Sequence, residues 1–216
     1  MEILYIHGLG GGVDSRIPSV LSEHYATHSY SCDGRSCTVN VHIFTYPFDP
    51  EKAQELIQAE ASRIKPDLVI GESLGANHAM CLRGMPHLYV SPAMRAPEVF
   101  ARIAPLTAIP GFGRILNRKF RPTRPGRQSM DFRKSVLKKY SKLHEYCMAN
   151  SRKDYAYAFF GTRDHYMKYG IVAVDQWKTL YGDYCMYEGS HYMELEYLHS
   201  MLIPKINSLL GLTELP

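Results

Sequence analysis

The sequence predicts an α/β fold, with about six mostly parallel strands in a sheet and helices on both of its faces. Short apolar runs alternate with helix-like stretches along most of the 216 residues, and this alternation is typical of a parallel sheet wrapped by helices. One apolar run also turns directly into a helix-like stretch at Gly71-Glu72-Ser73-Leu74-Gly75. The length fits a single domain over residues 1–216.

Each expected strand is a short apolar run, and the expected helices lie between or after these runs. The expected strands are residues 2–6, 39–45, 67–70, 87–91, 155–160 and 183–187. The expected helices are residues 51–64, 74–84, 168–180 and 191–209. A sheet of this kind places its functional site at the carboxyl ends of the strands.

The composition is that of a soluble globular protein, with 45% hydrophobic and 21% charged residues. No apolar run approaches the roughly 20 residues that a membrane-spanning helix needs, so we expect no stable membrane insertion. The first residues enter a strand-like run without the basic start and cleavage site of a signal peptide. These features predict a cytoplasmic protein.

The five cysteines follow no framework spacing. Cys32 and Cys37 lie in a polar stretch with His28 and His42 nearby, but the spacing differs from the common zinc patterns. We therefore expect reduced thiols, with neither a metal nor a cofactor.

The pentapeptide around Ser73 has the pattern of a nucleophile elbow, in which a strand turns sharply into a helix through Gly-x-Ser-x-Gly. The serine backbone is strained, and the positions two before and two after must be small because the chain passes close to itself. The hydroxyl is then exposed beside the first N–H groups of a helix, which favour a developing oxyanion. Ser73 is the expected nucleophile.

A glycine-rich run, His7-Gly8-Leu9-Gly10-Gly11-Gly12, follows the first expected strand. It does not fit a dinucleotide-binding fingerprint, because Val13 stands where the third glycine should be. Small residues instead let a backbone N–H face a reacting carbonyl. We expect the N–H groups of Leu9 and Leu74 to form an oxyanion hole. His7 is expected to organise the turn and is a candidate for the substrate pocket.

An acid and a histidine must follow the serine in the order Ser, Asp, His. Asp164 follows the strand-like run 155–160. His191 follows the run 183–187 and a Gly-Ser turn, and it is expected to open the last helix. In such a unit His191 takes the proton from Ser73, and Asp164 orients the imidazole. Glu188 remains a second candidate for the acid.

Two other histidines lie close to these residues in the sequence. His165 is adjacent to Asp164 but is expected to point the other way, so it is assigned to the pocket or the surface. His78 lies five residues after Ser73, inside a helix-like stretch, and we expect it to pack or to form a hydrogen bond in the core.

With these residues placed, the chain resembles the α/β-hydrolases and, more narrowly, the small YqiA-like bacterial esterases. The resemblance rests on four segments: Leu4-Tyr5-Ile6-His7-Gly8, Ile70-Gly71-Glu72-Ser73-Leu74-Gly75, Val90-Ser91-Pro92-Ala93-Met94-Arg95, and Glu188-Gly189-Ser190-His191 with the closing helix. It implies a minimal hydrolase without the first two strands of the larger fold. It also implies the Ser73, Asp164 and His191 triad and esterase activity on short acyl chains. Arg95 is placed in the substrate pocket without a defined role.

Residues 96–150 depart from that pattern and form an expected lid or cap insertion. They carry 12 Lys or Arg and three Asp or Glu, a balance of +9, whereas the rest of the chain has a balance of −5. The simpler interpretation is a solvated helical lid. The alternative is a surface for an acidic substrate or partner, such as a thioester on a phosphopantetheine or nucleotide carrier, an anionic membrane or nucleic acid. No aromatic residues are interleaved for base stacking, so nucleic acid is not expected.

Together these features predict a serine hydrolase that cleaves small carboxylic esters through an acyl-enzyme. A thioesterase acting on an acidic carrier such as acyl-CoA would use the same triad with a different pocket. A binding protein without catalytic activity is the alternative from another class, because a fold alone does not establish activity.

Overall fold

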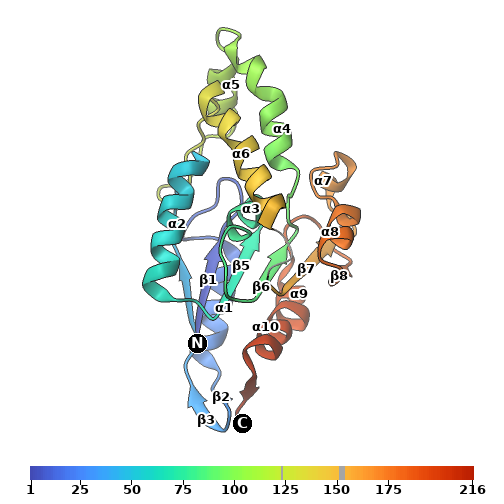
Figure 1. Ribbon diagram of the computed structural model, residues 1–216. Coiled ribbons are helices and arrows are strands. Elements are labelled where there is room, and N and C mark those ends of the chain that lie inside the picture. Colours follow the sequence, from blue (N-terminus) through green and yellow to red (C-terminus); the bar gives the residue numbers. More distant parts are fainter. Residues whose placement is uncertain (123, 151–153) are drawn as a thin grey trace.

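A computed structural model describes residues 1–122, 124–150 and 154–216 (Figure 1). Its centre is a six-stranded sheet with the order β4-β1-β5-β6-β7-β8, in which every neighbouring pair is parallel. The strands are β1 (Glu2–Ile6), β4 (Asn40–Ile43), β5 (Leu68–Glu72), β6 (His87–Val90), β7 (Ala156–Gly161) and β8 (Tyr184–Tyr187). The predicted fold class is confirmed, and each expected strand is present to within a few residues.

Helices cover both faces of this sheet and also extend beyond the carboxyl ends of its strands (Figure 1). They are α1 (Arg16–Thr27), α2 (Pro50–Ile64), α3 (Gly75–Ala79), α4 (Ala96–Ile103), the 3₁₀ helix η1 (Ala104–Ala108), α5 (Phe112–Lys119), α6 (Lys134–Asn150), α7 (His165–Lys168), α8 (Val174–Leu180), α9 (Leu195–Tyr197), the π-helix η2 (Leu198–Leu202) and α10 (Ile203–Leu210). In the part of the chain that is described, none of these helices is both long and apolar enough to cross a membrane.

The alternation of side chains along the strands divides the core into two layers. On β1, Leu4 and Ile6 pack into the layer formed with α2, α3, α6 and α8. Ile3 and Tyr5 pack into the opposite layer, with α1, η2 and α10. The strands are therefore buried on both faces, as expected for a parallel sheet.

The segment 96–150 lies between β6 and β7 and contributes to the first of these layers. Leu137, Tyr140 and Cys147 of α6 are completely buried there. The Tyr140 hydroxyl donates to the carbonyl of Phe48 at 2.6 Å. The base of the segment is thus part of the core of the domain.

Three of the expected helices have different limits in the structure. The helix expected at 74–84 ends at Ala79, and the one expected at 168–180 is interrupted at Gly170, whose φ of 65° is incompatible with a continuing helix. The expectation that His191 opens the last helix is wrong, because α9 begins at Leu195. The loop before α9 is needed to bring the imidazole over the edge of the sheet.

Two elements were not expected from the sequence. Helix α1 places Ile17, Leu21 and Tyr25 on one buried face. A small antiparallel sheet joins β2 (Tyr30–Cys32), β3 (Arg35–Cys37) and β9 (Leu212–Glu214) in the order β3-β2-β9. Its hairpin turns at Asp33-Gly34, where both residues have positive φ, which is the signature of a two-residue hairpin loop.

Candidate active site

Ser73 lies at the tip of the sharp turn between β5 and α3. Its φ is 51°, in the left-handed region that residues with side chains rarely adopt. Its N–H donates to the carbonyl of Val90 at 3.0 Å, and its own carbonyl accepts from Ala93 N at the same distance. Both partners belong to the segment 90–95, so one role of that segment is to hold the strained backbone of Ser73.

Glycines on either side of Ser73 allow this turn to pack against its neighbours. A Cβ atom at Gly71 would lie 2.9 Å from the Cβ of Ala79, and one at Gly75 would lie 2.3 Å from the carbonyl oxygen of Ile6. Both separations are shorter than a van der Waals contact. The steric expectation for the elbow is confirmed.

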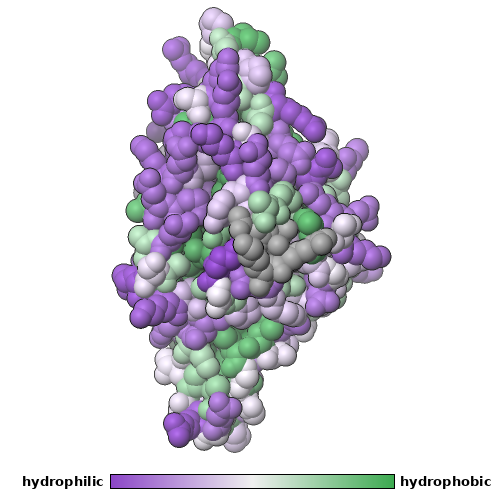
Figure 2. Space-filling model, viewed as in Figure 1, coloured by the Kyte–Doolittle hydropathy of each residue, from purple (hydrophilic) through white to green (hydrophobic). Residues whose placement is uncertain are grey.

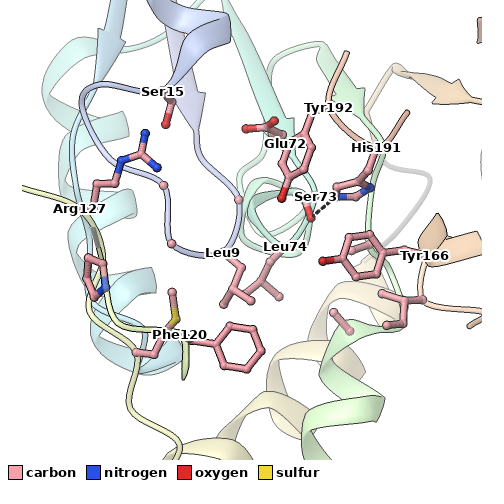
Figure 3. Close-up of a pocket in the computed structure, with 18 of the residues that line it drawn as sticks. Leu9, Ser15, Glu72, Ser73, Leu74, Phe120, Arg127, Tyr166, His191 and Tyr192 are labelled. Atoms are coloured by element: carbon pink, nitrogen blue, oxygen red, sulfur yellow. Dashed lines mark hydrogen bonds between the residues drawn. The ribbon is translucent and has the colours of Figure 1, made fainter. Parts of the chain in front are cut away.

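Ser73, His191 and Asp164 form an unbroken hydrogen-bonded chain, and Figure 3 shows its Ser73–His191 contact. His191 Nε2 lies 2.8 Å from Ser73 Oγ, and His191 Nδ1 lies 2.7 Å from Asp164 Oδ2. The side chains of His191 and Asp164 are 3% and 0% exposed. The other carboxylate oxygen of Asp164 accepts from Tyr166 N at 2.8 Å. Asp164 therefore holds the imidazole, whereas Glu188 is exposed.

The loops that carry Asp164 and His191 come together because β7 ends in a glycine. A Cβ atom at Gly161 would lie 2.2 Å from the carbonyl oxygen of Ser190. Glu194, just before α9, accepts a hydrogen bond from Ser190 N at 3.0 Å. These contacts fix the backbone of Ser190, directly before His191.

The glycine-rich loop after β1 passes directly beside Ser73. A Cβ atom at Gly8 would lie 3.0 Å from the Cβ of Ser73, so glycine is needed at this approach. Leu9 and Leu74 both line the cavity at Ser73. Within the described residues, neither of their N–H groups has a hydrogen-bond partner. Their assignment as an oxyanion hole stays a prediction.

A cavity of about 940 Å³ opens at Ser73, His191 and the glycine-rich loop. One wall comes from α4 and the loop after α5, and the other from the start of α1 and the residues beside the elbow. The lining residues include Leu9, Ser15, Arg16, Glu72, Leu74, Val99, Phe100, Phe120, Arg121, Arg127, Met130, Tyr166, Ile171 and Tyr192. Its size is that of a site for a small molecule.

His7 was expected at the pocket, but the structure places it beneath the glycine-rich loop. It is completely buried, its ring stacks on Tyr46 with centroids 4.1 Å apart, and Nδ1 lies 2.8 Å from the carbonyl oxygen of Gly8. Burial lowers the pKa of His7 to about 4. A Cβ atom at Gly11 would lie 2.8 Å from Cγ and Nδ1 of this ring. His7 therefore organises the turn, which was the other role expected for it.

Arg95 and His165 are likewise absent from the lining of this cavity. The Arg95 side chain is 44% exposed and pairs with Glu98 at 3.4 Å, because α4 begins at the next residue and turns the chain away. His165 is exposed, in agreement with the surface position that was the other expectation for it, and it packs its ring against Tyr166, with centroids 3.9 Å apart. It is Tyr166, one residue further, that faces the cavity.

Several polar residues of the cavity were not identified from the sequence. Glu72 precedes the nucleophile, and the buried Tyr5 donates a hydrogen bond to its carboxylate. Arg16 reaches the cavity from the first turn of α1 and also donates to the carbonyl of Met193. Arg16 could have been placed at the site only if helix α1 had been predicted from the sequence.

The structure offers no obvious place for a metal ion among the residues it describes. No group of three His, Cys, Asp or Glu side chains is arranged to hold one. All five cysteines are free, and Cys32 and Cys37 lie half-buried in the small sheet.

Comparisons with known proteins support the architecture. No family model and no curated protein sequence matches the chain. Among solved structures, a monoacylglycerol lipase from Paleococcus ferrophilus is similar, with a TM-score of 0.60 and 14% identity over 97% of this chain and 94% of that one. The mouse alpha/beta hydrolase domain-containing protein 10 has a TM-score of 0.62 and 14% identity, covering 97% and 89%.

An esterase from Exiguobacterium antarcticum is a third similar structure, with a TM-score of 0.58 and 11% identity over 97% of this chain and 91% of that one. At these identities the likeness concerns the backbone alone. The strand order, the turn at Ser73 and these neighbours agree, and the chain has the α/β-hydrolase fold.

Proposed function

We propose that this protein is a serine hydrolase that cleaves carboxylic esters through an acyl-enzyme, with Ser73, His191 and Asp164 as its catalytic triad. One observation carries the proposal: the hydrogen-bonded chain from Asp164 through His191 to Ser73 ends at a strained serine facing a cavity of about 940 Å³. A binding protein would have no need to maintain this strained and buried arrangement.

In the proposed reaction, His191 Nε2 accepts the Ser73 hydroxyl proton while Oγ attacks the ester carbonyl. Asp164 orients the ring and stabilises the imidazolium. The carbonyl oxygen gains negative charge beside the N–H groups of Leu9 and Leu74, which we assign as its donors. His191 then protonates the leaving alcohol, and water releases the acid from Ser73 by the same steps.

The chain length of the acyl group is part of this proposal. The wall formed by α4 and the loop after α5 is mainly apolar and includes the side chains of Phe100 and Phe120. Such a wall suits a short acyl chain. We also propose that residues 96–150 act as a lid, because they supply this wall, and that the protein is related to the YqiA-like esterases.

A screen of p-nitrophenyl esters from acetate to palmitate tests this function. We expect the highest kcat/KM at butyrate or hexanoate and no hydrolysis by the Ser73→Ala variant. Hydrolysis that persists in Ser73→Ala would contradict the mechanism. An intact fold with no turnover of any ester would favour a binding role.

A thioesterase acting on an acidic carrier is the second candidate, and Arg121 favours it because this residue lines the cavity. Its companions Arg118 and Lys119 are absent from the lining, so they could act only through long-range attraction. We expect Arg121→Gln to lower kcat/KM for butyryl-CoA more than for p-nitrophenyl butyrate, and Arg118→Gln to serve as the matched control. Equal effects of Arg121→Gln on both substrates would leave the ester as the better substrate class.

A further inference from the structure

The cavity has two unlike sides, and Ser73 lies between them. The apolar side belongs to the segment after β6 and to its neighbour Ile171, and its residues are Ala93, Ala96, Val99, Phe100, Phe120, Met130 and Ile171. The polar side is formed around the start of α1, with Ser15, Arg16, Glu72, Arg127 and Tyr192. In Figure 3, Glu72 and Tyr192 lie on the opposite side of Ser73 from Phe120.

We infer that the polar side binds the leaving alcohol of the ester and that this alcohol is uncharged and carries hydroxyl groups. The inference rests on the proposed hydrolase function and names the substrate class for it. Three features of the polar side support it: the chemistry of Glu72, the opposite charge of Arg16, and the position of His191.

Glu72 presents a hydrogen-bond acceptor to the cavity. Its Oε2 accepts from the buried hydroxyl of Tyr5, which fixes the carboxylate. Among the described residues, its Oε1 has no partner. An ionised carboxylate can only accept hydrogen bonds, so a group that binds there must donate one. A hydroxyl group of the substrate meets this requirement.

Arg16 and Glu72, on the polar side of the cavity, carry opposite charges. Arg16 lines the cavity, and it also donates to the carbonyl of Met193, the residue after Tyr192. Its guanidinium group can only donate hydrogen bonds. Arg127 also lies there, but it is paired with Asp14 at 2.8 Å. A charged leaving group of either sign would be attracted by one of these two residues and repelled by the other, so neither sign is favoured by both. A hydroxyl group both donates and accepts, so an uncharged polyol suits the two together.

The position of His191 identifies which part of the ester lies on this side. In ester cleavage the imidazole that activates the serine also protonates the leaving oxygen, so the alcohol must lie on the imidazole's side of the scissile bond. Tyr192 follows His191 directly, and two tyrosine rings lie against the imidazole, Tyr166 with centroids 4.5 Å apart and Tyr192 with centroids 5.3 Å apart. Burial and the nearby Glu72 carboxylate raise the pKa of Tyr192, so the two side chains are close, as Figure 3 also indicates. The alcohol is therefore directed to the polar side and the acyl chain to the apolar side.

A matched pair of esters tests the inference. Propyl butyrate and 2,3-dihydroxypropyl butyrate share the acyl chain and differ by two hydroxyl groups on the alcohol. We expect the wild-type enzyme to prefer the dihydroxy ester by about tenfold in kcat/KM, since hydrogen bonds to charged groups are the stronger ones. Glu72→Leu should bring this ratio close to one, and Glu72→Gln, which keeps an acceptor for Tyr5, should lower it less.

Phe120→Ala is the matched control from the apolar side. It should lower kcat/KM for both esters by the same factor and leave the ratio of the two values unchanged. Reaction with a fluorophosphonate verifies that each variant has a folded, reactive Ser73. An unchanged ratio in Glu72→Leu, no preference in the wild type, or a preference for butyrylcholine would overturn the inference while the hydrolase function stands. Failure of the wild type to hydrolyse any ester would instead contradict the function itself.

Discussion

The elbow region, by which we mean residues 7–12, 71–79, 161–164 and 188–194 around Ser73, is held in place differently from the insertion at residues 96–150. In the elbow region, backbone passes so close to backbone that glycine is required at Gly75 and Gly161, where an added Cβ atom would lie within 2.3 Å of a carbonyl oxygen. The insertion packs its base into the core through side chains such as Tyr140. Its outer surface is charged, and hydrophilic side chains cover much of the upper part of Figure 2, where Figure 1 places α5 and α6.

Some of the insertion's charges are also paired with residues outside it. Arg127 and Arg124 pair with Asp14, and Lys139 pairs with Asp49 at 2.7 Å and with Glu51. Part of the positive charge of the insertion therefore binds it to the rest of the domain. The comparison shows that close backbone packing can be recognised from residue types, whereas a run of like charges does not indicate where its counter-charges lie.

The largest effect should come from breaking the hydrogen-bonded chain in the elbow region. Asp164→Asn removes the charge that orients and stabilises His191, and we expect kcat to fall by roughly 10⁴-fold. Glu188→Gln is the matched control, because its side chain is exposed and should change kcat little. Similar losses in the two variants would mean that Asp164 is not the acid.

The next effect concerns the backbone approach at the elbow. Gly75→Ala would place a methyl group 2.3 Å from the carbonyl oxygen of Ile6, and we expect it to destabilise the fold by about 3 kcal/mol or more. Gly126→Ala tests conformation alone, because it has positive φ with nothing within 4 Å of the added atom. Urea unfolding should show a much smaller loss for Gly126→Ala, and equal losses would argue against the steric account.

The buried histidines of the elbow region should also make the folding stability decrease in acid. Burial lowers the pKa of His7 to about 4 and that of His78 to about 3, so the unfolded chain binds their protons first. Stability is then complete above pH 6.5 and falls as the pH drops toward 4. Lowering the pH from 7 to 5 should reduce the free energy of unfolding by on the order of 2 kcal/mol for each of these two histidines.

Urea unfolding at several pH values measures this dependence. His78 Nδ1 accepts a hydrogen bond from Gln54 Nε2 at 2.9 Å, and a His78→Gln variant should show a flatter dependence of stability on pH than the wild type. A stability that rises as the pH falls from 7 to 5 would contradict the assignment of these histidines as buried and neutral.

The smallest effect should come from the surface charges of the insertion. Arg102 pairs with Glu98 on an exposed turn of α4 at 3.5 Å, and such pairs contribute about 0–1 kcal/mol. We expect Arg102→Gln to change the unfolding free energy by less than about 1 kcal/mol. A loss of several kcal/mol would show that the charges of the insertion hold it in place.

The same contrast explains what the sequence could predict. The six strands, Ser73, Asp164 and His191 were accessible because strand order, glycine spacing and chain order restrict them strongly. Glu72 and Arg16 were missed because nothing in their local sequence shows that they share a cavity. They share the cavity because of where α1 begins relative to the elbow, and this depends on the tertiary packing of the chain.

Two residues that were assigned to the pocket from the sequence show the same limit. Arg95 and His165 each lie next to a segment with a clear sequence pattern. Each also lies where a helix begins, and there a shift of one residue points the side chain in a different direction. Tyr166 faces the cavity in place of His165 for this reason. Adjacency in the sequence was therefore insufficient to assign them.

The most direct measurement of the central claim is peptide mapping by mass spectrometry after reaction with a fluorophosphonate. We predict one phosphonyl group per chain, located on Ser73, together with complete loss of ester hydrolysis. The Ser73→Ala variant should be neither labelled nor active. A label on another serine, or an unlabelled Ser73 in a protein that still hydrolyses esters, would contradict the account.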